Sequence, residues 1–423
     1  GGDGRAARGK LRPAAFAAGF AALLAAAVAI PLVVLGGDDG ASAADREAIS
    51  TSLAEAAFAE EDTAAAARLS LAAYRIAPTA AAELAMISSL APESAVRTPA
   101  ASTPYTAITL SPSGDLLAGT DDSGMLRLWR VAHGEEPELV AELPASDHFG
   151  GVDFSTNGET QVLASGGSAS AGYLWDVTDP AAVSELGRAD APSGQIRRVA
   201  LSADGSRLVT AESGSITLWD TEDPTQPRFL SLLARVRVLS DIALSPDGSL
   251  LATAGVGGAV QLWDLSDPAN PVERASATGY VGAVNSVAFS PDGQQLITGG
   301  EDRTVRIWNL ANPSEPVLTH ELEGHTQPVT AVAFGPHGEP VSGDAGGVVA
   351  YWVTSLAGDS APPMVIASDL DSGIRDLAVD ESLEALVLST GSGEIVFWTT
   401  HGERLAELAC ATPEYRMGQD EWE

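Results

Sequence analysis

Seven tryptophans recur at nearly equal intervals, and this repeat limits the possible folds more than any other feature of the sequence. The gaps between successive members are 46, 44, 44, 45, 44 and 46 residues, and only Trp422 falls outside the series. The members are Trp129, Trp175, Trp219, Trp263, Trp308, Trp352 and Trp398. Such a period is typical of proteins that stack one small structural unit many times.

The repeats share an internal pattern as well as a length. A turn ending in glycine lies upstream of most of the tryptophans, as in "SPDG" at Ser245–Gly248 and Ser290–Gly293. An alternating apolar run such as "SVAFS" precedes the turn, and another such as "QLITGG" follows it, which predicts short β-strands. Four strands in about 45 residues are typical of one blade of a β-propeller. Because one blade cannot bury both faces of its sheet, we expect an all-β, seven-bladed ring.

The residues around the tryptophans resemble a known family. "LWD" occurs at Leu174–Asp176, Leu218–Asp220 and Leu262–Asp264, and "IWN" at Ile307–Asn309. On these motifs the chain resembles the WD40-repeat family over roughly residues 100–409. The resemblance is specific for the fold and says almost nothing about function.

In that family a buried His and Asp often brace each blade; the His follows a glycine and the Asp lies six residues before the tryptophan. His325 follows a glycine, but its repeat has Gly346 at the Asp position. Asp302 is correctly placed, but its repeat begins with Gly279-Tyr280. We therefore expect no blade to hold both members, and apolar packing between blades to supply most of the stability.

Composition argues against several classes of function. The chain has 423 residues and a net charge of −34, so its surface repels nucleic-acid phosphates. Lys10 is the only lysine, which excludes a P-loop within this chain, and Cys410 is the only cysteine, which excludes an internal disulfide. Neither closely spaced histidine ligands nor a G-x-S-x-G motif occurs. The sequence predicts a protein that is not an enzyme and needs no metal or cofactor.

The N-terminal region predicts a membrane anchor. Residues 14–35 contain no charge over 22 positions, enough to cross about 30 Å of hydrocarbon. Basic residues precede this segment and Asp38-Asp39 follow it, so the N-terminus is expected in the cytoplasm and the propeller outside, on a single-pass cell-membrane protein. A cleaved signal peptide ending at "ASA", 41–43, is the alternative, and it also places the propeller outside the cytoplasm.

Between this segment and the propeller lies an alanine-rich stretch without strand alternation. Residues 45–59, 62–77 and 80–90 predict three helices; Pro78 ends the second and Thr79 caps the third. The expected order is 1–13 basic segment, 14–35 transmembrane helix, 36–98 helical neck, 99–409 propeller and 410–423 tail. Either 403–409 or 93–100 could supply the last outer strand of the ring, but not both.

A second resemblance covers the neck. "LSLAAYRIAPTAAAELAMISSL", the connectors "WDVTDP", "WDTEDP" and "WDLSDP", and the tail "ACATPEYRMGQDEWE" resemble large bacterial WD40-repeat proteins. Those proteins carry a STAND-type NTPase upstream of a membrane segment, and the propeller follows. The resemblance implies that this propeller is a sensor or regulatory end. The NTPase itself is not in the sequence, so no NTPase activity belongs to these residues.

Alignment of the seven predicted innermost strands on "AVNSVAF" brings one residue per repeat to the rim of the central channel. These residues are Thr106, Gly150, Arg197, Ser240, Asn285, Thr330 and Arg375. Arg198 follows Arg197, and Arg235 and Arg237 precede a neighbouring inner strand. Guanidinium groups suit carboxylates and phosphates, so these arginines predict an anion-binding patch. Pairing with nearby Asp and Glu is the alternative.

Aromatic residues near the same rim could anchor an interface, since aromatics and Arg dominate binding hot spots. Tyr280 is the candidate; core packing is the favoured role of Tyr105 and Phe149. The sequence therefore predicts a membrane-anchored, non-enzymatic WD40 scaffold that binds another protein or a surface ligand. The alternative is the sensor domain of a STAND-type NTPase.

Overall fold

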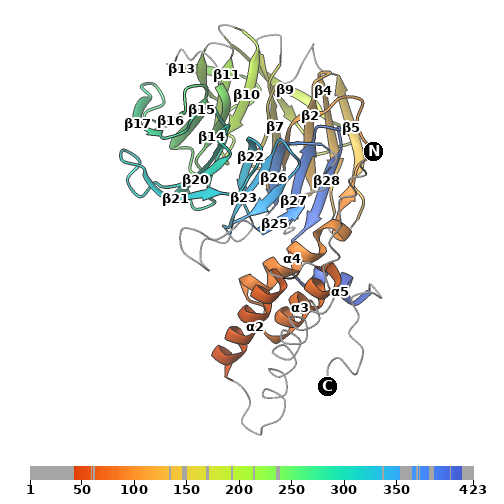
Figure 1. Cartoon of the computed structure of the whole chain (residues 1–423). Coiled ribbons are helices and arrows are strands. Elements are labelled where there is room, and N and C mark those ends of the chain that lie inside the picture. The colour runs from red at the N-terminus through yellow and green to blue at the C-terminus, as the bar shows by residue number, and fades with distance from the viewer. Residues whose placement is uncertain are drawn as a thin grey trace, which may run out of the picture. The chain divides into compact units, whose positions relative to one another are not determined.

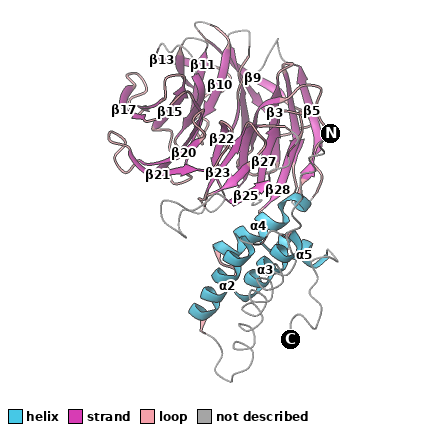
Figure 2. Ribbon diagram, in the orientation of Figure 1, coloured by secondary structure: helices cyan, strands magenta, loops and turns pink. Residues whose placement is uncertain are grey.

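The computed structural model divides the chain into two compact units, Gly1–Leu90 with Gly402–Glu423, and Ala91–His401. The residues that it describes are 42–58, 60, 62–132, 135–144, 150–167, 171–191, 194–212, 215–234, 239–335, 338–352, 364–367, 370, 372–380, 385–400 and 402–411. All described strands lie in the second unit, and Figure 2 draws them in magenta.

Seven antiparallel sheets of four strands make up the described part of Ala91–His401, which confirms the seven-bladed propeller. The first three sheets are β2 (Tyr105–Leu110), β3 (Leu116–Asp121), β4 (Met125–Arg130) and β5 (Glu138–Pro144); β6 (Val152–Asn157), β7 (Thr160–Ser165), β8 (Ala171–Asp176) and β9 (Ser184–Asp190); and β10 (Ile196–Leu201), β11 (Arg207–Glu212), β12 (Ile216–Asp220) and β13 (Arg228–Ala234). The next three are β14 (Leu239–Leu244), β15 (Leu250–Gly255), β16 (Ala259–Asp264) and β17 (Val272–Thr278); β18 (Val284–Phe289), β19 (Gln295–Gly300), β20 (Thr304–Asn309) and β21 (Val317–Glu323); and β22 (Val329–Phe334), β23 (Pro340–Asp344), β24 (Val349–Tyr351) and β25 (Met364–Ala367). The seventh holds β26 (Ile374–Asp380), β27 (Ala385–Thr390), β28 (Ile395–Thr399) and β1 (Val96–Arg97).

The seventh sheet takes its outer strand from the start of the unit, where β1 pairs with β28 and Val96 lies opposite Phe397. Beside this pair, the Thr98 N–H donates to the Ile395 carbonyl at 2.9 Å, and the Ile395 N–H donates to Thr98 Oγ1 at 3.0 Å. Of the two segments left open by the sequence, 93–100 therefore closes the ring. Residues 403–409 lie in helix α5 (Gly402–Ala411) instead.

The first strands of neighbouring sheets contact one another in a closed cycle, and β26 of the last sheet contacts β2 of the first. In Figure 1 the last sheet, in blue, accordingly lies beside the first, in orange. Apolar clusters fill the space between neighbouring sheets; one joins Leu128 of the first sheet to Phe154 and Leu163 of the second. The strands that surround the central channel are thus fixed by packing on both sides.

Polar networks also brace some of the sheets, and the expectation that no blade holds both His and Asp is wrong for the sixth. His325 Nδ1 lies 2.9 Å from Asp344 Oδ2, and His325 Nε2 lies 2.7 Å from Ser342 Oγ. The indole N–H of Trp352 donates to the same Ser342 Oγ at 2.8 Å. Asp344 ends β23, two residues before the position that the family spacing gave to Gly346, so the spacing alone missed it.

The fifth sheet has a network of the same kind without a histidine. The Tyr280 hydroxyl donates to the Thr298 carbonyl at 2.9 Å, and the Trp308 indole N–H donates to Thr298 Oγ1 at 3.0 Å. The Arg306 guanidinium lies 3.9 Å from the Tyr280 ring centre and donates to Asp302 Oδ2 at 2.9 Å. Tyr280 therefore occupies the place that His325 has in the next sheet.

The other unit is helical, with α2 (Ala43–Phe58), α3 (Thr63–Ile76), α4 (Ala80–Ser94) and α5. The three helices predicted for the neck are confirmed, and so is the Thr79 cap, whose Oγ1 accepts from the Ala82 N–H at 3.2 Å. Asp62 caps α3 by accepting from the Ala65 N–H at 2.9 Å. Small residues such as Ala54, Ala73 and Ala82 form the buried core between the helices.

Helix α5 follows the last propeller strand but belongs to the helical unit, where it contacts α3. Arg75 Nη2 lies 2.8 Å from Cys410 Sγ, and Gly402 lies against the Tyr74 ring, where a Cβ would come within 2.6 Å of the ring. The expected propeller range of 99–409 thus differs from the structure at both ends.

Among the described residues, no helix is long and apolar enough to cross a membrane. The anchor expected at residues 14–35 lies outside the part of the chain that the structure describes.

Candidate functional site

The central channel is lined by the first strand of each sheet. Such a strand pairs with only one neighbour, so its second edge carries backbone groups without a ladder partner. Polar side chains of adjacent sheets satisfy several of these groups. Asp376 Oδ2 accepts from the Ile108 N–H at 2.9 Å, Asp241 Oδ2 from the Val287 N–H at 3.0 Å, and Ser286 Oγ from the Val332 N–H at 3.2 Å. These bonds tie neighbouring first strands together around the channel.

A β-bulge at the start of six of the seven first strands, all except β6, decides which side chains reach the mouth of the channel. In β10 the register with β11 shifts between Ile196 and Arg198, so Arg197 is the extra residue. The same shift in β26 makes Arg375 the extra residue. The extra residue of a bulge is left unpaired, and its side chain is re-aimed relative to the strand. The other extra residues are Thr106, Ser240, Asn285 and Thr330.

These bulges bring most of the predicted rim residues into one pocket, called here the mouth pocket. It has a volume of about 300 Å³ and is lined by Arg197, Arg198, Leu239, Ser240, Asn285, Thr330 and Arg375. Of the other two aligned positions, Thr106 lines the adjoining channel. Gly150 packs directly on the third sheet, since a Cβ there would lie 2.5 Å from Arg197 Cα.

Two uncharged polar side chains of the mouth pocket form hydrogen bonds to the neighbouring sheets. Asn285 Nδ2 donates to the Val329 carbonyl at 2.8 Å, and Thr330 Oγ1 donates to the Ile374 carbonyl at 2.7 Å. These two side chains therefore join neighbouring sheets and hold the mouth in shape.

The arginines differ from one another in their contacts. Arg198 is half-buried, with Nε 3.4 Å from Asp241 Oδ1 and Nη1 donating to the Arg197 carbonyl at 3.0 Å. Arg197 and Arg375 are exposed, and neither side chain forms a hydrogen bond or ion pair with any residue that the structure describes. The mouth pocket thus presents two guanidinium groups that no described residue binds, and they can bind a ligand.

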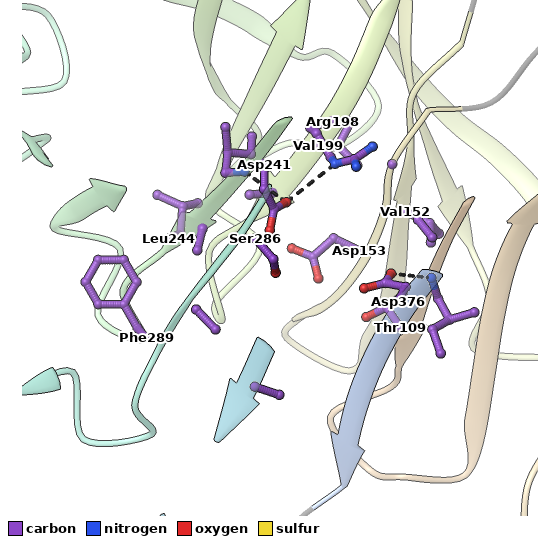
Figure 3. A pocket seen from close by; sticks show the side chains of 18 of the residues that line it. Thr109, Val152, Asp153, Arg198, Val199, Asp241, Leu244, Ser286, Phe289 and Asp376 are labelled. Atoms are coloured by element: carbon purple, nitrogen blue, oxygen red, sulfur yellow. Dashed lines mark hydrogen bonds and ion pairs between the residues drawn. The ribbon is translucent and has the colours of Figure 1, made fainter. Parts of the chain in front are cut away.

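The channel that adjoins the mouth pocket has a volume of about 420 Å³ and holds three carboxylates, those of Asp153, Asp241 and Asp376. In Figure 3 these carboxylates reach into the same space from different strands, and dashed lines mark the contact of Arg198 with Asp241 and the backbone bond of Asp376. Asp153 Oδ2 accepts from the Leu201 N–H of the third sheet at 2.7 Å.

Burial in the channel makes these carboxylates weak acids. It raises the pKa of Asp153 to about 7, although backbone N–H groups oppose the change. It also raises the pKa of Asp376 to about 7, with a further contribution from the Asp241 carboxylate. The pKa of Asp241 is raised by burial and held back by Arg198. The channel can therefore exchange protons near neutral pH.

These three carboxylates are not among the site residues predicted from the sequence. Each lies within an apolar run of a first strand, as in "SDIAL" and "RDLAV". An acidic residue inside such a run is the sequence feature that could have indicated a carboxylate in the channel.

One further predicted site residue, Tyr280, lies outside the mouth pocket. Tyr280 is only 8% exposed, and its hydroxyl is used within the fifth sheet, so the structure does not bring it into the mouth pocket. Arg235 and Arg237 lie outside the described residues. Within the described part of the chain, no three His, Cys, Asp or Glu side chains are arranged to hold a metal ion.

Comparison with protein families agrees with this architecture. Residues 185–220, 235–264, 274–309 and 316–353 match the family model "WD domain, G-beta repeat". The matched segments contain the first three strands of the third to sixth sheets, and the remaining sheets have the same antiparallel order. The four matched repeats and the seven sheets together support membership of the WD40-repeat family.

Proposed function

We propose that this WD40-repeat chain is a non-enzymatic protein-binding module that receives its partner at the mouth pocket. WD40 propellers are typical interaction scaffolds, so the fold supports this class of function. The observation that carries the proposal is the pair of exposed side chains, Arg197 and Arg375, which line one pocket without partners among the described residues. Arginine is enriched in the hot spots of protein interfaces.

The lining of the mouth pocket also supports binding over catalysis. The described residues that line it include no histidine, cysteine or carboxylate. It offers guanidinium, amide and hydroxyl groups, which suit recognition, whereas acid–base or nucleophilic catalysis needs titratable groups in contact with the substrate.

The setting that we propose is a cell membrane. The uncharged segment 14–35, with basic residues before it and Asp38-Asp39 after it, supports a single-pass anchor with a cytoplasmic N-terminus. The propeller would then meet its partner outside the cytoplasm.

A second candidate function is that of a sensor or regulatory domain for a STAND-type NTPase encoded upstream. The resemblance of residues 69–90 and of the blade connectors to such proteins supports it. A reading frame that continues upstream into a P-loop would favour this candidate, and its absence would remove it.

Capture of a partner from membrane extract tests the leading proposal. The full chain in mild detergent is crosslinked in an extract of its source membranes beside an Arg197→Glu/Arg375→Glu variant. A matched control, Arg228→Glu/Arg274→Glu, makes the same charge change on β13 and β17, where both arginines pair with aspartates at the exposed surface. We expect the wild type and the control to capture the same partner and the mouth variant, shown to be folded by circular dichroism, to lose it. Equal capture by all three proteins would contradict the mouth as the site.

A further inference from the structure

The channel and its mouth carry an uneven distribution of charge. The charged side chains that line them within the described residues are Arg197, Arg198, Arg375, Asp153, Asp241 and Asp376. All three arginines line the mouth pocket, and Arg198 and Arg375 also line the adjoining channel, which holds the three carboxylates. Only Arg198 and Asp241 come within ion-pair distance of each other, at 3.4 Å.

The other described charged side chains of the mouth pocket and the channel form no ion pairs with one another. Arg197 and Arg375 have no acidic partner among the described residues. Asp153 and Asp376 are held by backbone N–H groups, those of Leu201 and Ile108. A negative group of a ligand at the mouth would therefore meet Arg197 or Arg375 while the Asp153 and Asp376 carboxylates line the adjoining channel.

We propose that the mouth pocket binds a carboxylate of an acidic segment on the partner protein, and that Asp153 and Asp376 take up protons when it binds. This inference rests on the proposed function and assigns the chemistry of its partner. Guanidinium groups bind carboxylates through paired N–H donors, which Arg197 and Arg375 can supply. A dianionic phosphate would face the channel carboxylates with twice the charge.

The coupling between mouth and channel follows from their closeness. Arg375 lines the channel together with Asp153 and Asp376, in a volume of about 420 Å³. An anion bound by Arg375 therefore shares this volume with both carboxylates, and charges that are partly buried are screened less by salt than exposed ones. The negative charge of the ligand disfavours the ionised form of that carboxylate and of Asp153.

These charges determine how the affinity for the ligand changes with pH. Asp153 and Asp376 both have a pKa of about 7 in the free protein, so each is roughly half protonated at neutral pH. A bound carboxylate raises both pKa values further, and protons are taken up on binding. Affinity consequently rises as the pH falls from 8 to 6. The ligand does not titrate in this range, because glutamate has a pKa of about 4.3.

The test uses the full chain in a non-ionic detergent and a rhodamine-labelled hexaglutamate peptide blocked at both ends. Binding is followed by fluorescence anisotropy at physiological salt, with hexaglutamine as the control peptide. We expect hexaglutamate alone to bind, about threefold to tenfold more tightly at pH 6 than at pH 8. Arg197→Gln/Arg375→Gln should weaken binding at least ~10-fold, since each charge-assisted bond contributes about that factor or more.

A second variant isolates the proton uptake. Asp153→Asn/Asp376→Asn keeps an oxygen at each position that accepts the backbone N–H and removes the titration of both side chains. We expect this variant to bind hexaglutamate at pH 8 about as tightly as the wild type does at pH 6, and with a weaker pH dependence than the wild type, because Asp241 remains. An unchanged pH dependence in this variant overturns the inference. So does equal wild-type affinity at pH 6 and 8, or a failure of the wild type to bind at pH 6.

Phosphate provides a further arm of the same experiment. Displacement of hexaglutamate by millimolar inorganic phosphate would assign the mouth to a phosphate ligand and overturn the inference. None of these contrary results decides the outcome of the capture experiment above, because that experiment does not depend on the chemistry of the partner.

Discussion

Arg197 and Arg375 owe their place at the channel mouth to a one-residue irregularity in the strands that carry them. Each is the extra residue of a β-bulge, so it has no partner across the ladder. The alignment of the repeats predicted which residues share this position, because the repeat length is nearly constant. It could not predict the bulges, since these depend on the register of pairing and not on the local pattern.

The buried network of the sixth sheet shows a second limit at the scale of single residues. The spacing rule looked for an acid six residues before Trp352 and found glycine, whereas Asp344 reaches His325 from the end of the preceding strand. The geometry of the turn between the strands decides which carboxylate arrives there. Asp344 Oδ1 also accepts the Gly346 and Val348 N–H groups at 2.9 Å, which fixes that turn.

We predict that His325→Leu lowers the free energy of unfolding by about 2–4 kcal/mol at pH 7.5, because it removes the partner of a fully buried carboxylate. His320→Leu, on the outer strand β21, is the matched control and should change it by less than about 0.5 kcal/mol. Urea unfolding of the full chain measures both. Similar losses in the two variants would contradict a bracing role for His325.

The same pair of proteins gives a pH dependence with a definite sign. Burial lowers the pKa of His325, although the bond to Asp344 opposes this. The unfolded chain therefore binds a proton at this position near pH 6.5, before the folded protein does. The contribution of His325 to stability is present above that pH and falls as the pH drops below it. The difference between wild type and His325→Leu should thus be smaller at pH 5 than at pH 7.5.

At the scale of elements, the closure of the ring depends on a strand of two residues. β1 is short, but Thr98 adds two hydrogen bonds to Ile395 beside it. The sequence did not decide whether residues 93–100 or 403–409 supply the closing strand, because both segments flank the repeats. The pattern of "ERLAELA" favours a helix: Leu405 and Ala409 lie four residues apart and are both buried in α5.

We predict that Thr98→Pro destabilises the propeller by about 2–4 kcal/mol, because it removes one bond to Ile395 as donor and the other as acceptor. Ala100→Pro is the control, at an exposed position whose N–H donates to no residue that the structure describes. Tryptophan fluorescence during urea unfolding follows the propeller, since the seven repeat tryptophans all lie in that unit. Equal stability of the two variants would mean that β1 does not close the ring.

At the scale of the whole molecule, a strongly acidic chain has three arginines, Arg197, Arg198 and Arg375, at the mouth of its channel. The net charge of −34 repels anions at a distance, but screening within about 8 Å leaves the mouth arginines to act locally. The number of blades followed from the sequence because the tryptophan repeat covers the whole ring. The identity of the partner did not, since the rim residues differ from blade to blade and the fold is shared by many functions.

The placement of a photo-crosslinker tests the central claim, that a partner docks at the mouth, most directly. p-Benzoylphenylalanine replaces Ser240 in the mouth pocket or, as a control, Val317 on β21, which is 59% exposed. After irradiation in source membranes, we expect an adduct from position 240 that disappears when Arg197→Glu/Arg375→Glu is added. An adduct only from position 317, or one from position 240 that survives the arginine changes, would contradict the account.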